Sequence, residues 1–545
     1  MYLVTAEQMR QAEEAANASG LSYEAMMENA GRAVAEAIET EFNVAGRQAT
    51  ILIGPGNNGG DGLVAARYLA DLGAFVSLYI WRRANLEQDP NWQRLRDYAL
   101  PTFYQQQDPG HRQLADLLQR SAIVVDALLG TGVSRPIEGA LADLLIAAGE
   151  VVQQRRALRP PTLLDPIDPP EIAEIGPAIV AVDLPSGLRT DTGALDPLTL
   201  PADVTVTFAA AKRGQVLFPG AAYVGQLLMA DIGLEETYFP PNLPQLATSV
   251  LVGEMLPERP MSGHKGTFGK ALIVAGCLNY TGAPALAAGA AYRVGAGLVT
   301  VALPGPIQAM VAANLTEATY LLLPHCEGVI ASTAAEVVAQ SLAQYDALLV
   351  GPGLGQAAPT VRFVDALLSA LAEGEVNPPP AAWPPLVFDA DALNILAGQP
   401  DWWKRLPQNS ILTPHPGEMS RLAQKPIAEL EANRLELIPE LAQTWGQTIV
   451  FKGAFTVIAS PEGETVVMPF ANPALATAGS GDVLAGCIVG LLGQGRPPFE
   501  AAVAGAYLHG LAGELARERF WEGGVLAGDL LPLLPLALKE VAAGL

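Results

Sequence analysis

Apolar and polar positions along the chain fall into short apolar runs that alternate with longer amphipathic segments. Residues 5–40 carry apolar side chains at helical spacing, with a break at Ser19-Gly20. From Ala49 the pattern changes. Strands are expected at 49–53, 75–80, 122–125 and 178–182, and helices at 63–72 and 112–120. Strands that alternate with helices are typical of a parallel sheet covered by helices on both faces.

A second alternation of the same kind starts at residue 270. Its strands are expected at 270–275, 298–302, 347–350, 386–388, 410–413 and 448–451. The stretch 236–262 has many prolines and little periodicity, which is typical of a linker. We therefore predict two α/β domains, at 1–235 and 263–545, joined by the linker 236–262. Two proline-rich segments, 153–176 and 377–385, interrupt the pattern and are predicted to be surface insertions.

Composition narrows the classes of function. Half of the residues are hydrophobic and 16% are charged, so large buried cores are expected. The net charge of −24 argues against a general nucleic-acid binder, which needs a basic field. The three cysteines lie far apart, so neither a disulfide framework nor a zinc site is expected. No uninterrupted apolar run reaches the roughly 18 residues that cross a membrane. The N-terminus does not resemble a signal peptide, and we expect a cytoplasmic protein.

The most informative stretch of the first half is GPGNNGGDG, residues 54–62, between a predicted strand and a helix. Such loops hold phosphate in α/β proteins. The stretch lacks the GxGxxG spacing of a dinucleotide fingerprint, and Asn57, Asn58 and Asp61 add oxygens that also suit a hard cation. The alternative is a tight turn that needs positive φ. Two asparagines and an aspartate among five glycines are more than such a turn requires.

Two further polar stretches follow predicted strands: DALLGTG at 126–132 and DLPSG at 183–187. Each alone is compatible with an aspartate that ends a strand before a turn. The carboxyl ends of parallel strands meet at one edge of a sheet, where open α/β sheets bind their ligands. Three such stretches at one edge therefore indicate a binding site.

Together with MENAG at 27–31, these stretches resemble the NAD(P)H-hydrate epimerase family over nearly all of 1–235. The resemblance implies a Rossmann-like three-layer α/β/α fold. It also implies a substrate that is NADH or NADPH hydrated at the nicotinamide ring, whose R and S epimers the enzyme interconverts. The implied ligands of a potassium ion are Asn58, Asp126 and Ser186. The implied contacts to the hydrate are Asn57, Asn58, Gly59, Gly60, Asp61, Gly130, Thr131, Gly132, Val133, Ser134, Arg135, Pro136 and Asp183.

Epimerisation inverts a ring carbon that bears a hydroxyl, and this requires a group that shuttles a proton. Asp183 stands at the end of a predicted strand, among residues that the resemblance places near the hydrate. It is our candidate for the catalytic group of the first domain.

In the second half, the run NPALATAGSGDVLAG at 472–486 puts a glycine turn before an apolar helix. The free N–H groups of such a helix start can stabilise phosphate oxygens, and Asp482 can accept a proton from a substrate hydroxyl. The alternative is that Asp482 is an N-cap residue after a glycine turn.

Three upstream stretches also follow predicted strands: GPGLG at 351–355, TPHPGE at 413–418 and FKGA at 451–454. The glycines of the first permit close approach of a ligand. His415 lies between two prolines, which favours a site over a structural histidine. Lys452 can neutralise a nucleotide phosphate, or it is simply an exposed lysine. The stretch 262–270 is not a P-loop, because its spacing is one residue too long and Ala271 replaces the required Ser or Thr.

These stretches, with HKGTFGK at 264–270, resemble the ADP-dependent NAD(P)H-hydrate dehydratase family over residues 245–540, which implies a ribokinase-like α/β fold. By resemblance, Gly355, His415 and Asp482 lie at the hydrate. The implied nucleotide contacts are Lys452, Gly453, Ala454, Phe455, Thr456 and Gly481. The resemblance implies that ADP phosphorylates the hydroxyl of the S hydrate to give AMP, and that phosphate then leaves to restore NAD(P)H. Asp482 is the expected base, and Mg²⁺ the expected ion that offsets phosphate charge.

The two resemblances describe successive steps, so we predict a bifunctional isomerase and lyase that repairs nicotinamide nucleotides. The competing hypothesis is a ribokinase-like small-molecule kinase with an N-terminal binding or scaffold domain. The expected partners are hydrated NADH or NADPH and ADP, with neither nucleic acid nor membrane. We also expect a homo-oligomer.

Overall fold

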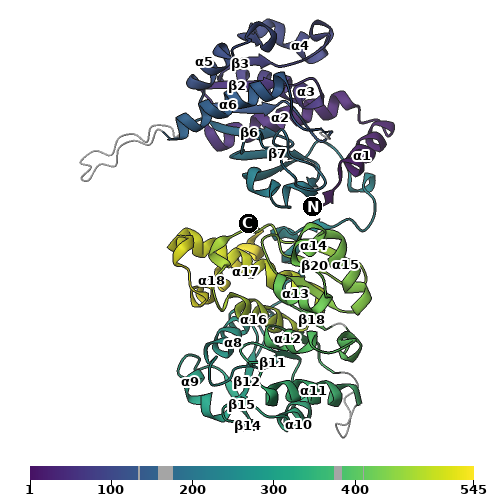
Figure 1. Cartoon of the computed structure of the whole chain (residues 1–545), viewed down its shortest axis with the longest axis vertical. Coiled ribbons are helices and arrows are strands. Elements are labelled where there is room, and N and C mark those ends of the chain that lie inside the picture. Colours follow the sequence, from purple (N-terminus) through teal and green to yellow (C-terminus); the bar gives the residue numbers. More distant parts are fainter. Residues whose placement is uncertain (133–134, 158–175, 374–382, 409, 545) are drawn as a thin grey trace, which may run out of the picture. The chain divides into compact units, whose positions relative to one another are not determined.

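The chain divides into two compact units, Met1–Leu243 and Pro244–Leu545, in a computed structural model that describes residues 1–132, 135–157, 176–373, 383–408 and 410–544 (Figure 1). The division falls inside the stretch 236–262 that we expected to be a linker. Part of this stretch belongs to the second unit. Its strand β10 (Gln245–Leu246) pairs with the second sheet, and helix α7 (Ser249–Met255) starts at Thr248, whose side chain accepts a hydrogen bond from the N–H of Leu251.

The first unit is built around a parallel sheet in the order β4-β3-β2-β5-β6-β7-β9. Its strands are β2 (Gln48–Ile53), β3 (Phe75–Ile80), β4 (Thr102–Tyr104), β5 (Ile123–Ala127), β6 (Ala178–Val182), β7 (Val204–Phe208) and β9 (Gln226–Ala230). Its helices are α1 (Ala6–Ala18), α2 (Tyr23–Phe42), α3 (Asn57–Asp71), α4 (Pro90–Leu95), α5 (Arg112–Arg120) and α6 (Ala140–Ala157). A separate two-stranded ladder joins β1 (Leu3–Val4) to β8 (Ala211–Lys212).

The side chains of β2 show why this unit has three layers. Ile51 and Ile53 belong to the core under α1, α2 and α3, whereas Leu52 between them belongs to the core under α5 and α6. All three are fully buried, so the strand reads as a continuous apolar run. The predicted three-layer α/β/α arrangement is confirmed.

The second unit contains a ten-stranded sheet in the order β10-β21-β20-β19-β18-β17-β16-β11-β12-β13. Only the pairings of β20 are antiparallel among these strands. The strands after β10 are β11 (Lys270–Val274), β12 (Leu298–Pro304), β13 (Thr319–Leu323), β16 (Ala347–Val350), β17 (Leu386–Phe388), β18 (Ile411–Leu412), β19 (Thr448–Phe451), β20 (Val457–Ala459) and β21 (Thr465–Val467). A small hairpin joins β14 (His325–Cys326) to β15 (Val329–Ile330).

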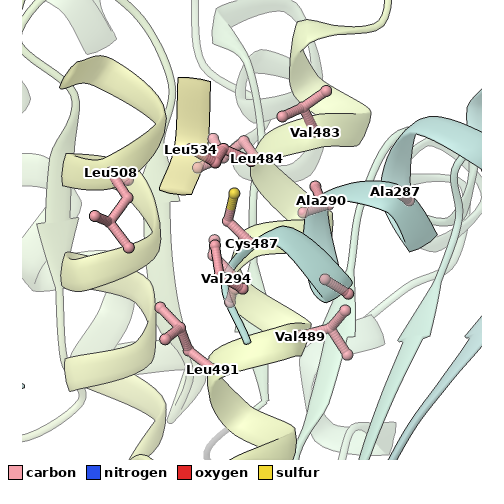
Figure 2. Close-up of a cluster of buried hydrophobic side chains, with 14 of the residues drawn as sticks. Ala287, Ala290, Val294, Val483, Leu484, Cys487, Val489, Leu491, Leu508 and Leu534 are labelled. Carbon is pink, nitrogen blue, oxygen red and sulfur yellow. The ribbon is translucent and has the colours of Figure 1, made fainter. Parts of the chain in front are cut away.

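The helices of the second unit cover both faces of this sheet. After α7 they are α8 (Gly282–Arg293), α9 (Gln308–Ala312), α10 (Ala334–Ser341), α11 (Ala358–Glu373), α12 (Asp391–Ala397), α13 (Pro416–Ala423), α14 (Ile427–Ala432), α15 (Arg434–Trp445), α16 (Ser480–Gly493), α17 (Pro498–Phe520) and α18 (Ala527–Ala543). On one face, Figure 2 shows Cys487 of α16 among apolar side chains of α8, α17 and α18. Gly486 lets α8 approach closely, since a Cβ there would collide with the carbonyl of Ala287. This packing fixes the start of α16.

Three other expectations concern cysteines, membranes and insertions. Cys277, Cys326 and Cys487 are free thiols. Among the helices that the structure describes, none has both the length and the apolar character needed to cross a membrane. Of the predicted insertion 153–176, residues 153–157 continue α6, while 158–175 lie outside the described residues, as do 377–382 of the second insertion.

Candidate functional site

Residues 57–62 of the glycine-rich stretch 54–62 form the start of α3, and residues 54–56 connect β2 to it. We expected the helix to start near residue 63, but it starts at Asn57 with Gly56 as its N-cap. None of its five glycines has positive φ, so the alternative of a turn that needs positive φ is wrong. Glycine is required here because a side chain would not fit. A Cβ at Gly59 would collide with the carbonyl of Gly54, and one at Gly60 would lie 2.6 Å from the sulfur of Met27.

Arg83 contacts this first turn from outside, and no pattern in the sequence predicted this contact. Its Nη1 donates hydrogen bonds to the carbonyls of Gly54 (3.1 Å) and Gly56 (2.9 Å). Its Nε donates to Asp89 at 2.7 Å, and Asp89 is also the N-cap of α4. The arginine therefore links the phosphate-loop candidate to a helix end and fixes the direction of the free N–H groups.

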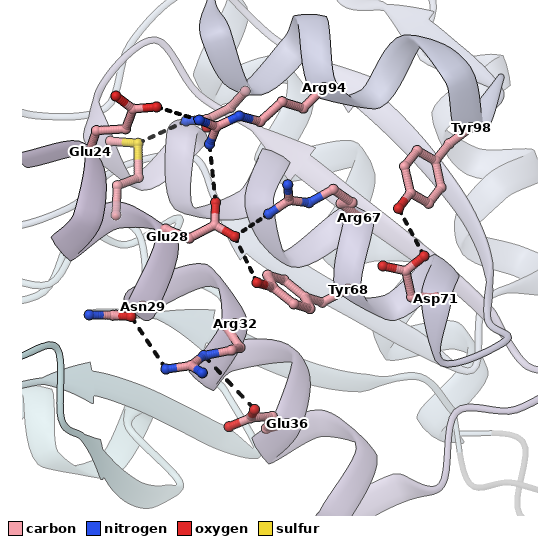
Figure 3. Close-up of polar contacts among 12 residues, drawn as sticks. Glu24, Glu28, Asn29, Arg32, Glu36, Arg67, Tyr68, Asp71, Arg94 and Tyr98 are labelled. Carbon is pink, nitrogen blue, oxygen red and sulfur yellow. Dashed lines mark hydrogen bonds and ion pairs between the residues drawn. The ribbon is translucent and has the colours of Figure 1, made fainter.

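A polar network fastens α2 to α3 and α4 (Figure 3). Glu28 accepts hydrogen bonds from Arg67, from Tyr68 (2.7 Å) and from Arg94 (3.3 Å). Further along, α2 and α3 pack closely at Gly31, where a Cβ would collide with Val64. The stretch MENAG at 27–31 thus forms the wall against which the glycine turn rests.

The three expected potassium ligands lie together at the carboxyl edge of the sheet. Asp126 Oδ1 accepts from Ser186 Oγ (2.6 Å) and the N–H of Leu128 (3.2 Å), and Asp126 Oδ2 accepts from the N–H of Ser186 (2.8 Å). Asn58 Nδ2 donates to the carbonyls of Leu129 (2.9 Å) and Val182 (2.6 Å). Asn58 Oδ1 points at Gly130, where a Cβ would collide with it. Three polar side chains and two carbonyls therefore converge in one place.

This set of donors fits a monovalent cation. All of its metal-binding atoms are oxygens, and Asp126 is the single carboxylate among neutral groups. Burial raises the pKa of Asp126, and within the described residues no cationic side chain pairs with it. A bound cation would offset this buried charge.

Asp183 is held by groups that the sequence did not single out. Its backbone has a φ of +64°, and its Oδ1 accepts hydrogen bonds from Lys212 Nζ (2.5 Å) and Thr207 Oγ1 (3.0 Å). Lys212 is fully buried and donates its other protons to Thr207 Oγ1 (2.9 Å) and the carbonyl of Phe208 (3.1 Å). Gln215 joins the two residues, since it donates to the carbonyl of Asp183 and accepts from the N–H of Lys212.

Two more carboxyl groups face this ion pair. Burial raises the pKa of Asp61 well above its usual range, and the neighbouring charges of Asp183 and Glu13 raise it further, against Arg83 and Lys212. Burial likewise raises the pKa of Glu13, which Lys212 partly opposes. The site therefore combines one ammonium group with three carboxyl groups.

The remaining expected hydrate contacts form a rim. Asn57, Gly132, Arg135 and Pro136 are exposed, and Val133 and Ser134 lie outside the described residues. The carbonyl of Thr131 accepts a hydrogen bond from Thr190 Oγ1 at 3.0 Å, which ties the rim to the loop after β6.

In the second unit, Asp482 lies in the first turn of α16. The N-cap is Gly479, with φ of +92°, so the alternative that Asp482 is an N-cap residue is wrong. Burial and the neighbouring charge of Asp389 raise the pKa of Asp482 to about 7, against the effect of Lys452. A Cβ at Gly481 would lie 3.4 Å from Lys452 Nζ. The structure thus brings Lys452, Gly481 and Asp482 together.

Lys452 is paired, not freely exposed, so the simpler interpretation of an exposed lysine is wrong. Its Nζ lies 2.8 Å from Asp389 Oδ1 and 3.7 Å from Glu418 Oε2. Thr413 Oγ1 also donates to Asp389 Oδ1, at 2.7 Å. Burial raises the pKa of Glu418 to about 7. Asp389 was missed because the stretch DAD at 389–391 has no glycine, although it follows a strand as Asp126 does.

His415 and Gly355 are both anchored by polar contacts. His415 caps α13, because its Nδ1 accepts a hydrogen bond from the N–H of Gly417 at 3.0 Å. Burial lowers the pKa of His415, and the nearby charges of Lys452 and Arg421 lower it further. The N–H of Gly355 donates to Asp391 Oδ2 at 2.8 Å.

The segment 452–456 forms a tight turn around its own side chains. The N–H of Gly453 donates to Thr456 Oγ1 (3.2 Å), which donates to the carbonyl of Gly453 (2.9 Å), and Phe455 has a φ of +53°. Buried Arg434 donates to the carbonyl of Ala454 at 2.9 Å. The turn begins at Lys452, the residue that pairs with Asp389.

Two family models match the chain: one described as NAD(P)H-hydrate dehydratase at residues 271–536, and one described as YjeF-related protein N-terminus at residues 23–214. The bifunctional NAD(P)H-hydrate repair enzyme Nnr of Moorella thermoacetica is 39% identical, over 100% of this chain and 99% of that one. The protein of the same name from Thermofilum pendens is 34% identical, over 97% and 94%. Among solved structures, the ADP/ATP-dependent NAD(P)H-hydrate dehydratase from Bacillus subtilis is 34% identical and covers 55% of this chain and 100% of its own, with a TM-score of 0.47.

Proposed function

Because the chain belongs to the family of bifunctional NAD(P)H-hydrate repair enzymes, we propose that its two units carry the two steps at the sheet edges described above. The first unit epimerises hydrated NADH and NADPH, and the second dehydrates the S epimer. The observation that carries the first assignment is Asp183, held by a buried lysine next to a glycine-rich helix start. The second rests on Asp482, a carboxyl with a pKa of about 7 beside the N–H groups of α16.

In the first unit, the free N–H groups of α3 bind the pyrophosphate-bearing part of the substrate, and the hydrated ring faces Asp183. Lys212 and Thr207 both donate to Oδ1 of Asp183, and no described residue donates to Oδ2. Oδ2 is therefore the oxygen that accepts the proton from the ring hydroxyl. The buried site excludes bulk water from this exchange.

We assign Asn58, Asp126 and Ser186 to a potassium ion. When bound, the ion supplies positive charge next to the anionic substrate and offsets the buried carboxylate. Its role is separate from proton transfer, since Asp126 already accepts three hydrogen bonds.

In the second unit, Asp482 takes the proton of the hydrate's hydroxyl, and the oxygen attacks the β-phosphorus of ADP, so that AMP leaves. Elimination of phosphate with loss of a ring C–H proton then restores the double bond of NAD(P)H. Lys452 and the start of α16 bear on the phosphate charge, while Gly453, Ala454, Phe455 and Thr456 contact the nucleotide.

The described residues contain no cluster of three His, Cys, Asp or Glu residues that could hold a metal ion. We therefore propose that Mg²⁺ enters with the phosphates of the nucleotide and is held by at most one or two carboxylates of the chain. Asp389, directly after β17, and Asp391, at the start of α12, are our candidates for this, since the charges of both act on Asp482.

One incubation tests the function. Hydrated NADH is mixed with the protein and ADP, and absorbance at the NADH band is followed. Full recovery from a mixture of both epimers supports the two-step repair. If only the S hydrate is converted, and the R hydrate disappears no faster than by spontaneous epimerisation, the dehydratase activity is supported and the epimerase activity is refuted. No recovery with ADP or ATP, together with phosphorylation of a vitamin or sugar alcohol, would instead establish the kinase hypothesis, which the comparisons do not support.

We also propose that the protein is cytoplasmic and forms a homo-oligomer. Cell fractionation and light scattering of the purified chain test these two points.

A further inference from the structure

Asp61 is an expected hydrate contact whose carboxyl group has unusual surroundings. The residue is 7% exposed, yet no described residue donates a hydrogen bond to its carboxyl group. It lies in the first turn of α3, among the residues assigned to the hydrate. A buried carboxyl without donors favours the protonated form, because water and hydrogen-bond donors are what stabilise a carboxylate.

Asp183 has the opposite environment. It accepts two hydrogen bonds at Oδ1, one of them from the Lys212 ammonium, and all three protons of that ammonium have acceptors. The charged groups that face Asp61 are Asp183, Glu13, Arg83 and Lys212, and those that face Asp183 are Lys212, Glu13 and Asp61. One cation is thus in direct contact with one of the carboxyl groups.

We propose that Asp61 is the general acid and Asp183 the general base of epimerisation, with Lys212 as the positioning residue that distinguishes them. This inference rests on the proposed function of the first unit. Two carboxyl groups in contrasting environments are a recurrent way to obtain an acid and a base from one residue type. The raised pKa of Asp61 agrees with this division of roles.

The epimerisation step is the opening and closing of the ring at the hemiaminal carbon, with all atoms and electrons balanced. Hydration of the dihydropyridine puts the hydroxyl on a carbon bonded to the ring nitrogen. Asp183 takes the hydroxyl proton, the C–O bond becomes C=O, and the C–N bond breaks with its electron pair going to nitrogen. Asp61 gives its proton to that nitrogen. Rotation exposes the other face of the aldehyde, nitrogen attacks it, Asp183 returns its proton to oxygen, and Asp61 regains its own.

The test measures exchange of the separated R and S hydrates by chromatography, without ADP, so that the dehydratase is silent. The spontaneous rate is subtracted. For the wild type, kcat/KM is expected to fall at high pH, where Asp61 is ionised. Asp61→Asn is expected to lower kcat by about 100-fold, with KM within threefold, and to remove the alkaline limb. Asp71→Asn, the same change on the exposed end of α3, serves as the matched control.

Lys212→Met removes the ammonium group that holds Asp183 Oδ1, so it is expected to lower kcat rather than to raise KM. Asp61→Glu keeps an ionisable group and the alkaline limb, so it carries the test if Asp61→Asn fails to fold. Wild-type exchange combined with an unchanged kcat or a retained alkaline limb in Asp61→Asn would overturn the inference. Absence of exchange in the wild type itself would overturn the proposed function instead.

Discussion

Replacing Asp126 with asparagine tests the potassium assignment, because the variant should lose potassium binding while the stability of the potassium-free protein changes little. The carboxylate accepts three hydrogen bonds, two from backbone N–H groups and one from Ser186 Oγ. Asparagine has one acceptor oxygen and one NH₂ group. In the better orientation the NH₂ faces Ser186 Oγ, which can turn to accept, and the N–H of Leu128 loses its partner. The orphaned N–H costs about 1–3 kcal/mol.

The loss of the carboxylate's negative charge stabilises the folded variant and so opposes the cost of the orphaned N–H group. Burial raises the pKa of Asp126, so the empty wild-type site carries an unfavourable charge that the variant lacks. Without potassium, the two effects offset each other, and the Tm values of the first unit should be similar. With potassium at about 100 times its Kd, the wild type gains about 2.7 kcal/mol. For a unit of this size that corresponds to an increase in Tm of about 5–11 °C.

Thermal unfolding in KCl and in choline chloride at equal ionic strength measures this difference. The variant should gain less than about 2 °C, because the site has lost its only charge. Asp196→Asn is the control, since Asp196 also accepts from backbone N–H groups, of Ile137 and Leu198, but is not a ligand. A full potassium shift in Asp126→Asn, or none in an active wild type, would refute the assignment.

Three further outcomes are expected. Asp482→Asn should lower the dehydratase kcat by about 10²–10⁴-fold without affecting epimer exchange, and in the wild type kcat/KM should rise as the pH passes through about 7, where Asp482 ionises. Lys452→Met leaves the buried carboxylate of Asp389 unpaired, so it should destabilise the second unit by about 3–5 kcal/mol and raise the KM for ADP, both measurable on the full chain. Arg83→Met removes two hydrogen bonds to the glycine turn and should raise the KM for the hydrate about tenfold, whereas an unchanged KM would show that the turn holds itself.

Four strands of the first sheet were predictable because parallel strands buried on both faces are mostly apolar runs. Strands β2, β3, β5 and β6 lie within one or two residues of their expected positions. Strands β4 and β9 were missed because they lie at the two sheet edges and are only partly buried. Strand β7 was missed because its buried sequence, VTVTF, alternates threonine with apolar residues. The start of α3 was placed too late, since glycine and asparagine are poor helix formers and tertiary contacts set their conformation here.

The regions of the expected site came from one rule, that polar side chains after strands meet at the carboxyl edge, and the roles of single residues came from the family resemblance. The rule located Asn58 and Asp126, and the resemblance added Ser186, which donates a hydrogen bond to Asp126. The rule could not locate Lys212, which lies in a two-residue strand outside the main sheet. From sequence alone a lysine is expected at the surface. Only the fold shows that Lys212 is fully buried and that its ammonium group has three hydrogen-bond acceptors.

The ladder between β1 and β8 sets when the first unit becomes competent during synthesis. Leu3 and Val4 pair with Ala211 and Lys212, so the strand that seats the lysine is completed by residues made more than 200 positions earlier. At about 5–20 residues per second, the ribosome synthesises β8 roughly 10–40 s after β1. Until then the nascent chain can fold the central strands but not seat Lys212 against Asp183. Peptide tags placed directly before Leu3 should therefore affect epimerase activity more than dehydratase activity.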